Sequence, residues 1–408
     1  MDTTSPPHTA ICDSPVSGAP AGARQSGIAK ISLSDYRNYA SLSLSLEPEP
    51  VVLIGENGAG KTNLLEAISL FMPGRGLRRA PVENLTRAQT SQGWRAGLGV
   101  RTPGGMVQLG TGRLENEVSG KPGRIVRIDG QGKSGPGGFL DVLRLVWLTP
   151  SMDGLFSGPA SARRRYLDRI VITYDPSHTK RLNAFERAMR ERNRLLETPA
   201  PDTSWLKALE RQMAEHGTAI AAARRESAAR LNSLMAPSGG AHDEAGFPFA
   251  HIHVEGLLEN ELDEFAAVEV EDKYRTILGD SRKTDAAAGR CLQGPHRSDM
   301  SVLHGPKNMA AKLCSTGEQK ALLIAMTLGQ TRMVAQGCSA QGYMGAGPVL
   351  LLDEIAAHLD ARRRDSLFMT LLDMGVQAFM TGTDEGLFSR LGNKAIFLTV
   401  NDGVITRG

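Results

Sequence analysis

The chain has 408 residues, of which 41% are hydrophobic and 22% charged, and its formal net charge is +3. This is the composition of an ordinary folded protein with one large or two average domains, and the small net charge neither demands nor excludes nucleic acid. No apolar run is long enough to span a membrane, and the first residues lack the pattern of a secretory signal, so a cytoplasmic location is expected. Four scattered cysteines are too few for a disulfide framework or a zinc site.

The first half of the chain is typical of an α/β protein. Residues 1–27 are rich in Ser, Pro, Ala and Gly, which predicts a disordered tail. Alternating apolar residues from Gly27 to Leu33 and from Leu42 to Leu46 predict two strands. The short apolar run Val51–Ile54 predicts a buried strand. Glycine-rich stretches at 103–112 and 128–138 predict hairpin turns or surface loops.

A long helical segment follows. Apolar residues recur at helical spacing between 160 and 236, and Thr198–Asp202 interrupts the pattern, which predicts a helical hairpin. A strand-like pattern returns near Phe247–Val254, and an α/β pattern resumes at about 285. We therefore predict an α/β domain formed by 28–160 and 285–408, with a helical subdomain or arm inserted at 161–284.

A complete P-loop pattern follows the buried strand and precedes a predicted helix. Its glycines let backbone N–H groups surround phosphates, and the start of the helix adds partial positive charge. Lys61 is expected to neutralise the terminal phosphate oxygens, and Thr62 to give its hydroxyl to Mg²⁺. The predicted ATP-binding residues are Gly55, Glu56, Asn57, Gly58, Ala59, Gly60, Lys61, Thr62 and Asn63.

An acidic pair ends a second apolar strand near the end of the chain. Asp353 and Glu354 follow Pro348–Leu352, at the carboxyl end of a strand where ligands bind in open α/β sheets. Alone, such a pair is as often a plain strand-to-loop junction. Together with the P-loop it predicts Asp353 as a ligand of Mg²⁺ and Glu354 as the general base that activates water.

Most of the chain separates Lys61 from Asp353, which indicates a large insertion between two lobes.

The segment Cys314–Lys320 precedes a long apolar helix, and in it Ser315 and Glu318 fit a capping box. The same segment resembles the signature of ABC-type ATPases. That resemblance implies that Ser315, Gly317 and Gln319 reach the γ-phosphate of ATP bound to a partner protomer, and that Asp360 lies at the dimer seam.

Two positions depart from the general ABC pattern. At the place of the usual switch histidine stands a strand that ends in Thr381 and Thr383, so one of these hydroxyls, with Thr383 preferred, is expected to sense the γ-phosphate. Trp147–Asp153 lies where the Q-loop is expected but contains no glutamine.

Three further segments narrow the resemblance to the RecF family of SMC-like ABC ATPases. They are Ser34–Tyr39, which adds Arg37 and Asn38 as nucleotide contacts, Gly158–Asp168 and Gln293–Asp299. Ser298 replaces the usual aspartate, Met152 replaces an acidic residue, and the tail is extra. The resemblance implies an ATP- and Mg²⁺-dependent homodimer with slow hydrolysis that binds single-strand/double-strand junctions in gapped DNA. It also implies assistance in loading RecA, with RecR and RecO, during recombinational repair, replication-fork maintenance and the SOS response to DNA damage.

Two local basic clusters are candidates for contact with DNA phosphates, although such runs are usually solvated faces. They are Arg163–Arg165 and the trio Arg75, Arg78 and Arg79. Two alternatives remain open: the ATPase subunit of a membrane transporter, which shares the three nucleotide motifs, and a P-loop kinase, which leaves the signature segment unexplained.

Overall fold

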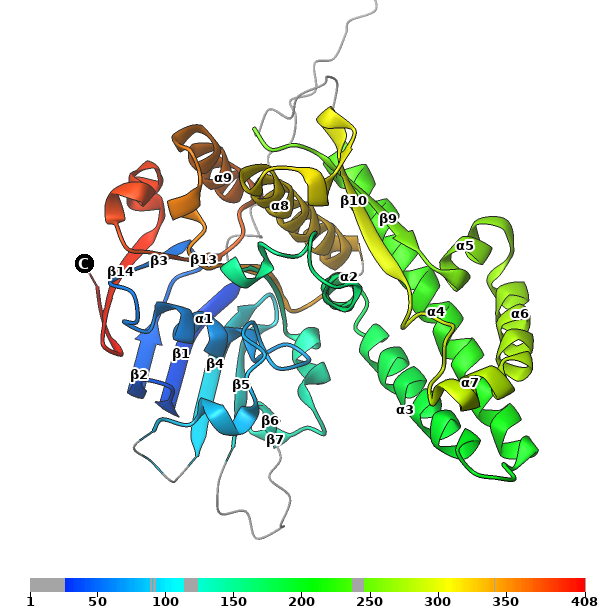
Figure 1. Cartoon of the computed structure of the whole chain (residues 1–408). Coiled ribbons are helices and arrows are strands. Elements are labelled where there is room, and N and C mark those ends of the chain that lie inside the picture. Colours follow the sequence, from blue (N-terminus) through cyan, green and yellow to red (C-terminus); the bar gives the residue numbers. More distant parts are fainter. Residues whose placement is uncertain are drawn as a thin grey trace, which may run out of the picture.

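The computed structural model describes residues 26–88, 90, 93–113, 124–236, 246–340 and 342–407. The predicted tail lies outside these residues except for its last two positions, and the first strand begins at Gly27. Figure 1 shows a head built on sheets, from which an arm of helices projects to one side. Within the described residues, no helix has both the length and the apolar character needed to cross a membrane.

The head is organised around a six-stranded sheet in the order β15-β14-β3-β13-β12-β8. Its strands run parallel except β15, which is antiparallel to β14. Because β13 lies between β3 and β12, the carboxyl ends of these three strands meet at one edge. The strands are β3 (Val51–Ile54), β8 (Leu143–Leu148), β12 (Ala346–Leu352), β13 (Ala378–Gly382), β14 (Ile396–Asn401) and β15 (Val404–Arg407).

Successive side chains of these strands enter two different hydrophobic cores. Leu351 packs into a core shared with a second sheet and with helix α1 (Lys61–Ser69), whereas Leu350 and Leu352 pack on the opposite face against α8 (Thr316–Ala340) and α9 (Ala361–Met374). A strand alternates its side chains between the two faces of a sheet, so a continuous apolar run is required where both faces are covered. This explains the unbroken apolar sequences of β3 and β12.

The second sheet is antiparallel in the order β2-β1-β4-β5-β6-β7. The predicted turn at 103–112 is wrong beyond its first residues, because β5 occupies most of it. Glycine is needed there for close packing: a Cβ on Gly112 would lie 2.6 Å from the carbonyl oxygen of Trp94 on the neighbouring strand. The strands are β1 (Gly27–Tyr36), β2 (Tyr39–Ser45), β4 (Trp94–Thr102), β5 (Gly105–Arg113), β6 (Ile125–Ile128) and β7 (Gln131–Gly132).

The inserted helices form the arm seen on the right of Figure 1. The break between α3 and α4 falls at the predicted segment, and the Asp202 carboxylate caps α4 by accepting from the N–H groups of Ser204 and Trp205. The hydrophobic core of the arm includes Met213 and Tyr274. The helices are α2 (Ala160–Tyr174), α3 (His178–Leu196), α4 (Thr203–Met235), α5 (Leu257–Glu264), α6 (Ala267–Asp280) and α7 (Arg282–Ala288), and the predicted boundary between 284 and 285 falls inside α7.

A small antiparallel sheet joins the arm to the part of the head around α8. It has the order β11-β10-β9, and its apolar residues share a core with α8. The predicted two-lobed α/β fold with an inserted helical subdomain is thus confirmed. The strands are β9 (Ala250–Glu255), β10 (Asp299–His304) and β11 (Met309–Ala310), and the short 3₁₀ helices are Val82–Leu85, Pro136–Asp141, Pro150–Met152, Gly305–Lys307, Ala311–Leu313, Ala356–His358 and Glu385–Lys394.

Candidate nucleotide-binding site

The P-loop connects β3 to α1 through left-handed backbone. Gly58 has φ 87° and Gly60 has φ 115°, conformations that side-chain-bearing residues rarely adopt. At Gly60, moreover, a Cβ would lie 2.4 Å from the side-chain nitrogen of Asn38. Gly60 is the N-cap of α1, and no side chain among the described residues caps the helix, so its first N–H groups are available to an anion.

Lys61 is buried at the start of this helix. Its Nζ donates to the carbonyl oxygens of Gly55, at 2.6 Å, and Glu56, at 2.8 Å. Burial lowers the pKa of Lys61, while the nearby charges of Glu354 and Asp353 raise it. Among the described residues, no carboxylate forms an ion pair with this ammonium, so its charge is available to phosphate oxygens.

Asp353 is joined to the P-loop across the sheet edge. The hydroxyls of Thr62 and Thr381 each donate to its Oδ1, both at 2.9 Å. Burial raises the pKa of Asp353, and these two hydrogen bonds lower it. The contacts exist because β3, β13 and β12 are neighbours and end together at one edge.

Glu354 follows with strained backbone. Its φ is 51°, unusual for a residue other than glycine, and its N–H donates to Thr381 Oγ1 at 2.8 Å. Thr381 therefore holds both members of the acidic pair. Thr383 is exposed, just beyond the end of β13. Its predicted role as the γ-phosphate sensor stays a prediction, whereas the hydroxyl of Thr381 contacts both Asp353 and Glu354.

The oxygens at this edge suit Mg²⁺. Within the described ranges, no group of three or more His, Cys, Asp or Glu side chains could hold a metal alone. Thr62 and Asp353 instead offer one hydroxyl and one carboxylate. Mg²⁺ in nucleotide sites is typically held by such a small set of hard oxygen ligands together with phosphates and water.

Behind the loop, two of the predicted nucleotide-binding residues brace it, one from the Ser34–Tyr39 segment and one from the start of α1. Asn38 donates to the carbonyl oxygen of Ala59 at 3.0 Å, and Asn63 donates to Asn38 Oδ1 at 2.8 Å. The hydroxyl of Tyr39, which the sequence did not single out, donates to the carbonyl oxygen of Gly60 at 3.0 Å. In this structure these side chains fix the shape of the loop.

Arg37 forms a bidentate pair with Glu66 of α1, at 2.9 and 3.0 Å. Arg37 has φ 53°, and Glu66 is completely buried. Sequence reasoning missed Glu66. The available signal was a carboxylate inside the apolar run Leu64–Ile68, because a buried charge requires a partner.

The signature turn begins α8, which packs on the face of the six-stranded sheet opposite α1. Ser315 and Glu318 form the predicted capping box: the Ser315 N–H donates to Glu318 Oε2 at 2.9 Å, and the Glu318 N–H donates to Ser315 Oγ at 3.4 Å. Hydrogen bonding from Lys307, and then from Ser315, lowers the pKa of Glu318 to about 2. Gln319 donates to the carbonyl oxygen of Cys314 at 2.9 Å.

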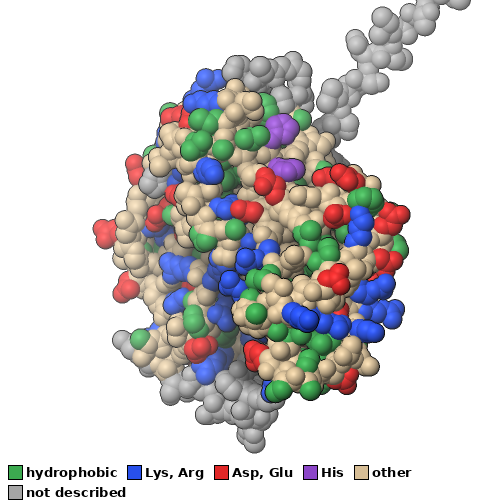
Figure 2. Space-filling view, turned by 45° about the vertical axis from the view of Figure 1, so that its right-hand side comes forward, with side chains coloured by type: hydrophobic (Ala, Val, Ile, Leu, Met, Phe, Trp, Pro, Cys, Tyr) green, Lys and Arg blue, Asp and Glu red, His purple; other side chains and the backbone are tan. Residues whose placement is uncertain are grey.

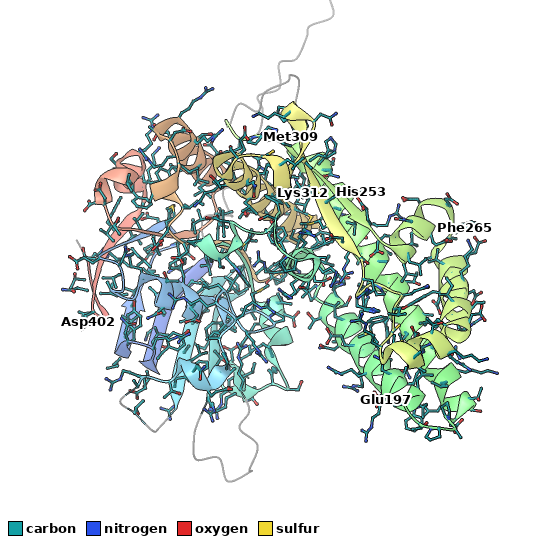
Figure 3. The ribbon with its side chains drawn as sticks, viewed as in Figure 1. Glu197, His253, Phe265, Met309, Lys312 and Asp402 are labelled. Atoms are coloured by element: carbon teal, nitrogen blue, oxygen red, sulfur yellow. The ribbon has the colours of Figure 1, made fainter. Side chains whose placement is uncertain are left out.

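The signature turn and the P-loop lie apart within one chain. In Figure 3, Lys312, just before the turn, is near the centre of the molecule, while Asp402 is at its left edge. The turn at Asp402 adjoins the P-loop, because the N–H of Gly403 donates to the carbonyl oxygen of Ala59 at 3.1 Å. Gly317 is exposed, and Asp360 caps α9 by accepting from the N–H of Arg363 at 2.8 Å.

Comparison with known proteins places the chain in a family. A family model described as an AAA domain matches residues 30–102. The DNA replication and repair protein RecF of Mesorhizobium japonicum is 49% identical over 381 residues, which are 93% of this chain and 98% of that protein. The chain belongs to the RecF family. The protein of the same name from Brucella suis is 50% identical, over 93% of this chain and 96% of that protein.

Solved structures agree on the fold. The recombination mediator protein RecF-ATP in the RecFOR pathway superposes with a TM-score of 0.79 at 20% identity, covering 96% of this chain and 100% of that chain. The Smc head domain from Pyrococcus furiosus has a TM-score of 0.51 at 14% identity, covering 93% and 95%. The predictions of the RecF family, of an ABC-type head and of an ATPase are confirmed. None of these matches favours the transporter or kinase alternative.

Proposed function

We propose that the chain binds gapped DNA, at single-strand/double-strand junctions, as a homodimer clamped by ATP, and that slow hydrolysis releases it. The observation that carries this proposal is the separation of the P-loop from the signature turn within one chain. A second copy arranged head to tail would bring its Ser315 and Gly317 to the first copy's P-loop. DNA binding would then depend on ATP, because only the closed dimer presents both heads together.

Each residue at the sheet edge has a chemical task in this proposal. Lys61 and the first N–H groups of α1 bind the phosphates, while Thr62 and Asp353 hold Mg²⁺. When bound, Mg²⁺ neutralises phosphate charge. Glu354 orients and deprotonates the attacking water. The rate is slow because the site is complete only when both protomers have closed.

The wider role follows from the names of the relatives. Proteins named for DNA replication and repair, and a structure of a recombination mediator protein named for the RecFOR pathway, support a role in recombinational repair. We infer that this role extends to replication-fork maintenance and to the SOS response. We infer that the chain works in the cytoplasm with RecR and RecO to assist the loading of RecA at gaps.

The first test measures binding to gapped duplex DNA together with molecular mass, with ATP, with ADP and without nucleotide. We expect a doubled mass and tighter DNA binding with ATP alone. Intact duplex of the same length serves as the control substrate. ATP binding without a dimer and without DNA affinity would reject the proposal.

Replacing Ser315 tests the composite site. Ser315→Ala should leave ATP binding unchanged and abolish the ATP-driven mass doubling, because the hydroxyl offered to the partner's nucleotide is lost. The lost cap costs about 0.5–2 kcal/mol of stability, so thermal unfolding is measured in parallel. Ser339→Ala, which alters an exposed hydroxyl near the other end of α8, is the matched control. Lys61→Ala should instead lose ATP binding itself. ATP-driven dimers of normal yield in Ser315→Ala would contradict a composite site.

A further inference from the structure

A cavity of about 1130 Å³ lies between the head and the base of the arm. Three segments form its walls: the loop after α1 at 72–79, the end of β8 with the residues that follow it at 147–155, and parts of α2 and α3. The fold thus brings together two basic clusters that are far apart in the sequence. Figure 2 shows Lys and Arg side chains gathering around the hollow in the middle of one face.

Four arginines that line this basic cavity have no ion pair among the described residues: Arg75, Arg79, Arg165 and Arg169. By contrast, Arg163, two positions from Arg165, is held by Asp299 at 2.7 Å and is therefore a structural residue. Because the four cations have no carboxylate partners, they leave a concentrated positive charge in a concave site. Such a site attracts a polyanion.

Acidic residues do not cancel this charge. In the part of the chain that the structure describes, two acidic residues line the basic cavity, Asp168 and Glu186. Asp168 is already engaged in a bidentate pair with Arg224, at 2.8 and 2.9 Å, and Glu186 is exposed. The charge of the cavity lining is therefore strongly positive.

Arg169 lines the basic cavity, and one nitrogen of its guanidinium group makes no hydrogen bond to the described residues. Its guanidinium lies over the rings of Trp147, at 4.5 Å, and Tyr166, at 5.2 Å. Among the described residues its Nε has no hydrogen-bond partner, whereas its Nη2 donates to the carbonyl oxygen of Trp147 at 3.5 Å. Burial lowers the pKa of Arg169 to about 10. The Arg169 side chain is partly buried and has no ion pair among the described residues, so an anionic ligand in the cavity would offset its charge.

The like charges also crowd one another. Burial, and then the charges of Arg165 and Arg75, lower the pKa of Arg79. Arg79 has φ 59°, a strained conformation for an arginine. Strain of this kind persists where the surrounding structure enforces it, and it is concentrated at binding sites. A negatively charged ligand would relieve the repulsion among these three arginines.

The basic cavity is distinct from the P-loop, since none of Gly55–Thr62 lines it. The two are nevertheless linked. Arg78, at the rim, donates to Asn63 Oδ1 at 2.6 Å, and Asn63 in turn donates to Asn38, which holds the P-loop at Ala59. An anion that draws Arg78 toward the cavity would therefore act on the nucleotide loop through this chain of hydrogen bonds.

We propose that the basic cavity binds successive phosphates of one nucleic-acid strand. This inference rests on the proposed DNA binding and assigns a place to it. Arginines on several walls suit a chain of phosphates, because the planar guanidinium binds phosphate oxygens in pairs. A cavity of about 1130 Å³ lined by three segments suits a single strand better than a duplex.

The test uses the full chain with saturating ATP and a labelled single-stranded oligonucleotide of thymines. Arg75→Ala and Arg165→Ala, both at exposed side chains, should each weaken binding by about fivefold at about 0.1 M salt, and each should reduce the salt slope of log K by about 0.7. Arg211→Ala is the matched control, because Arg211 is exposed on α4 outside the cavity. It should bind as the unmodified chain does.

Unchanged affinity and salt slope in both cavity variants, with normal binding by the unmodified chain, would overturn the cavity proposal alone. Absence of binding by the unmodified chain to gapped duplex and to the oligonucleotide would overturn the proposed function as well. Tripolyphosphate, added as a competitor while ATP saturates the P-loop, distinguishes a strand from free polyphosphate. If the two arginines governed tripolyphosphate binding but not oligonucleotide binding, the assignment to a strand would be wrong.

Discussion

Glu354→Gln should lower kcat for ATP hydrolysis by about 10²–10⁴-fold, the usual contribution of a general base, while ATP binding and dimer formation persist. The amide keeps the shape of the side chain but cannot take a proton from water. The strained backbone at Glu354 is held through its N–H by Thr381, and the substitution leaves this contact in place. The measurement is phosphate release at saturating ATP, compared with equilibrium binding of ATP.

Glu385→Gln is a suitable control, because Glu385 is an exposed carboxylate on the segment that follows β13. It should hydrolyse ATP at the unmodified rate. If Glu354→Gln retained full hydrolysis, the general base would have to be another residue. If it lost ATP binding, the role of Glu354 would be structural.

Arg192→Ala should destabilise the arm by about 3–5 kcal/mol, because it removes a buried cation that contacts two buried carboxylates. Arg192 is completely buried on α3. Its guanidinium contacts Glu210 at 3.1 Å and Asp285 at 2.7 Å, and it donates to the carbonyl oxygen of Leu278 at 2.6 Å. One side chain therefore ties α3 to α4, α6 and α7. Arg282 still reaches Glu210, so Asp285 is expected to bear most of the cost.

Hydrogen exchange of the amides in α3 and α4 gives the free energy of opening of the arm separately from that of the head. Arg190→Ala is the matched control, since Arg190 is exposed on the same helix, and it should change this free energy by less than about 0.5 kcal/mol. A loss below about 1 kcal/mol in Arg192→Ala would show that the buried network contributes little to the arm's stability.

Sequence patterns were sufficient to predict a structural feature wherever the interactions that form it are local in the chain. The P-loop is readable because glycines with positive φ must stand at fixed offsets before a helix. The break between α3 and α4 is readable because Pro199 and Pro201 cannot continue a helix, and Asp202 is a strong N-cap. The capping box at Ser315 and Glu318 follows from the same local chemistry.

Contacts between distant segments were decided by the tertiary structure. The sequence offered both Thr381 and Thr383 as switch hydroxyls, and only the order of β3, β13 and β12 places Thr381 against Asp353. Likewise, nothing in the sequence favoured one arginine of Arg163–Arg165 over another as a DNA contact. Only the packing shows that Arg163 pairs with Asp299 and that Arg165 lines the cavity. Local patterns specify backbone conformation, whereas the partner of a polar side chain depends on which strands and helices become neighbours, and that is set by packing of the whole chain.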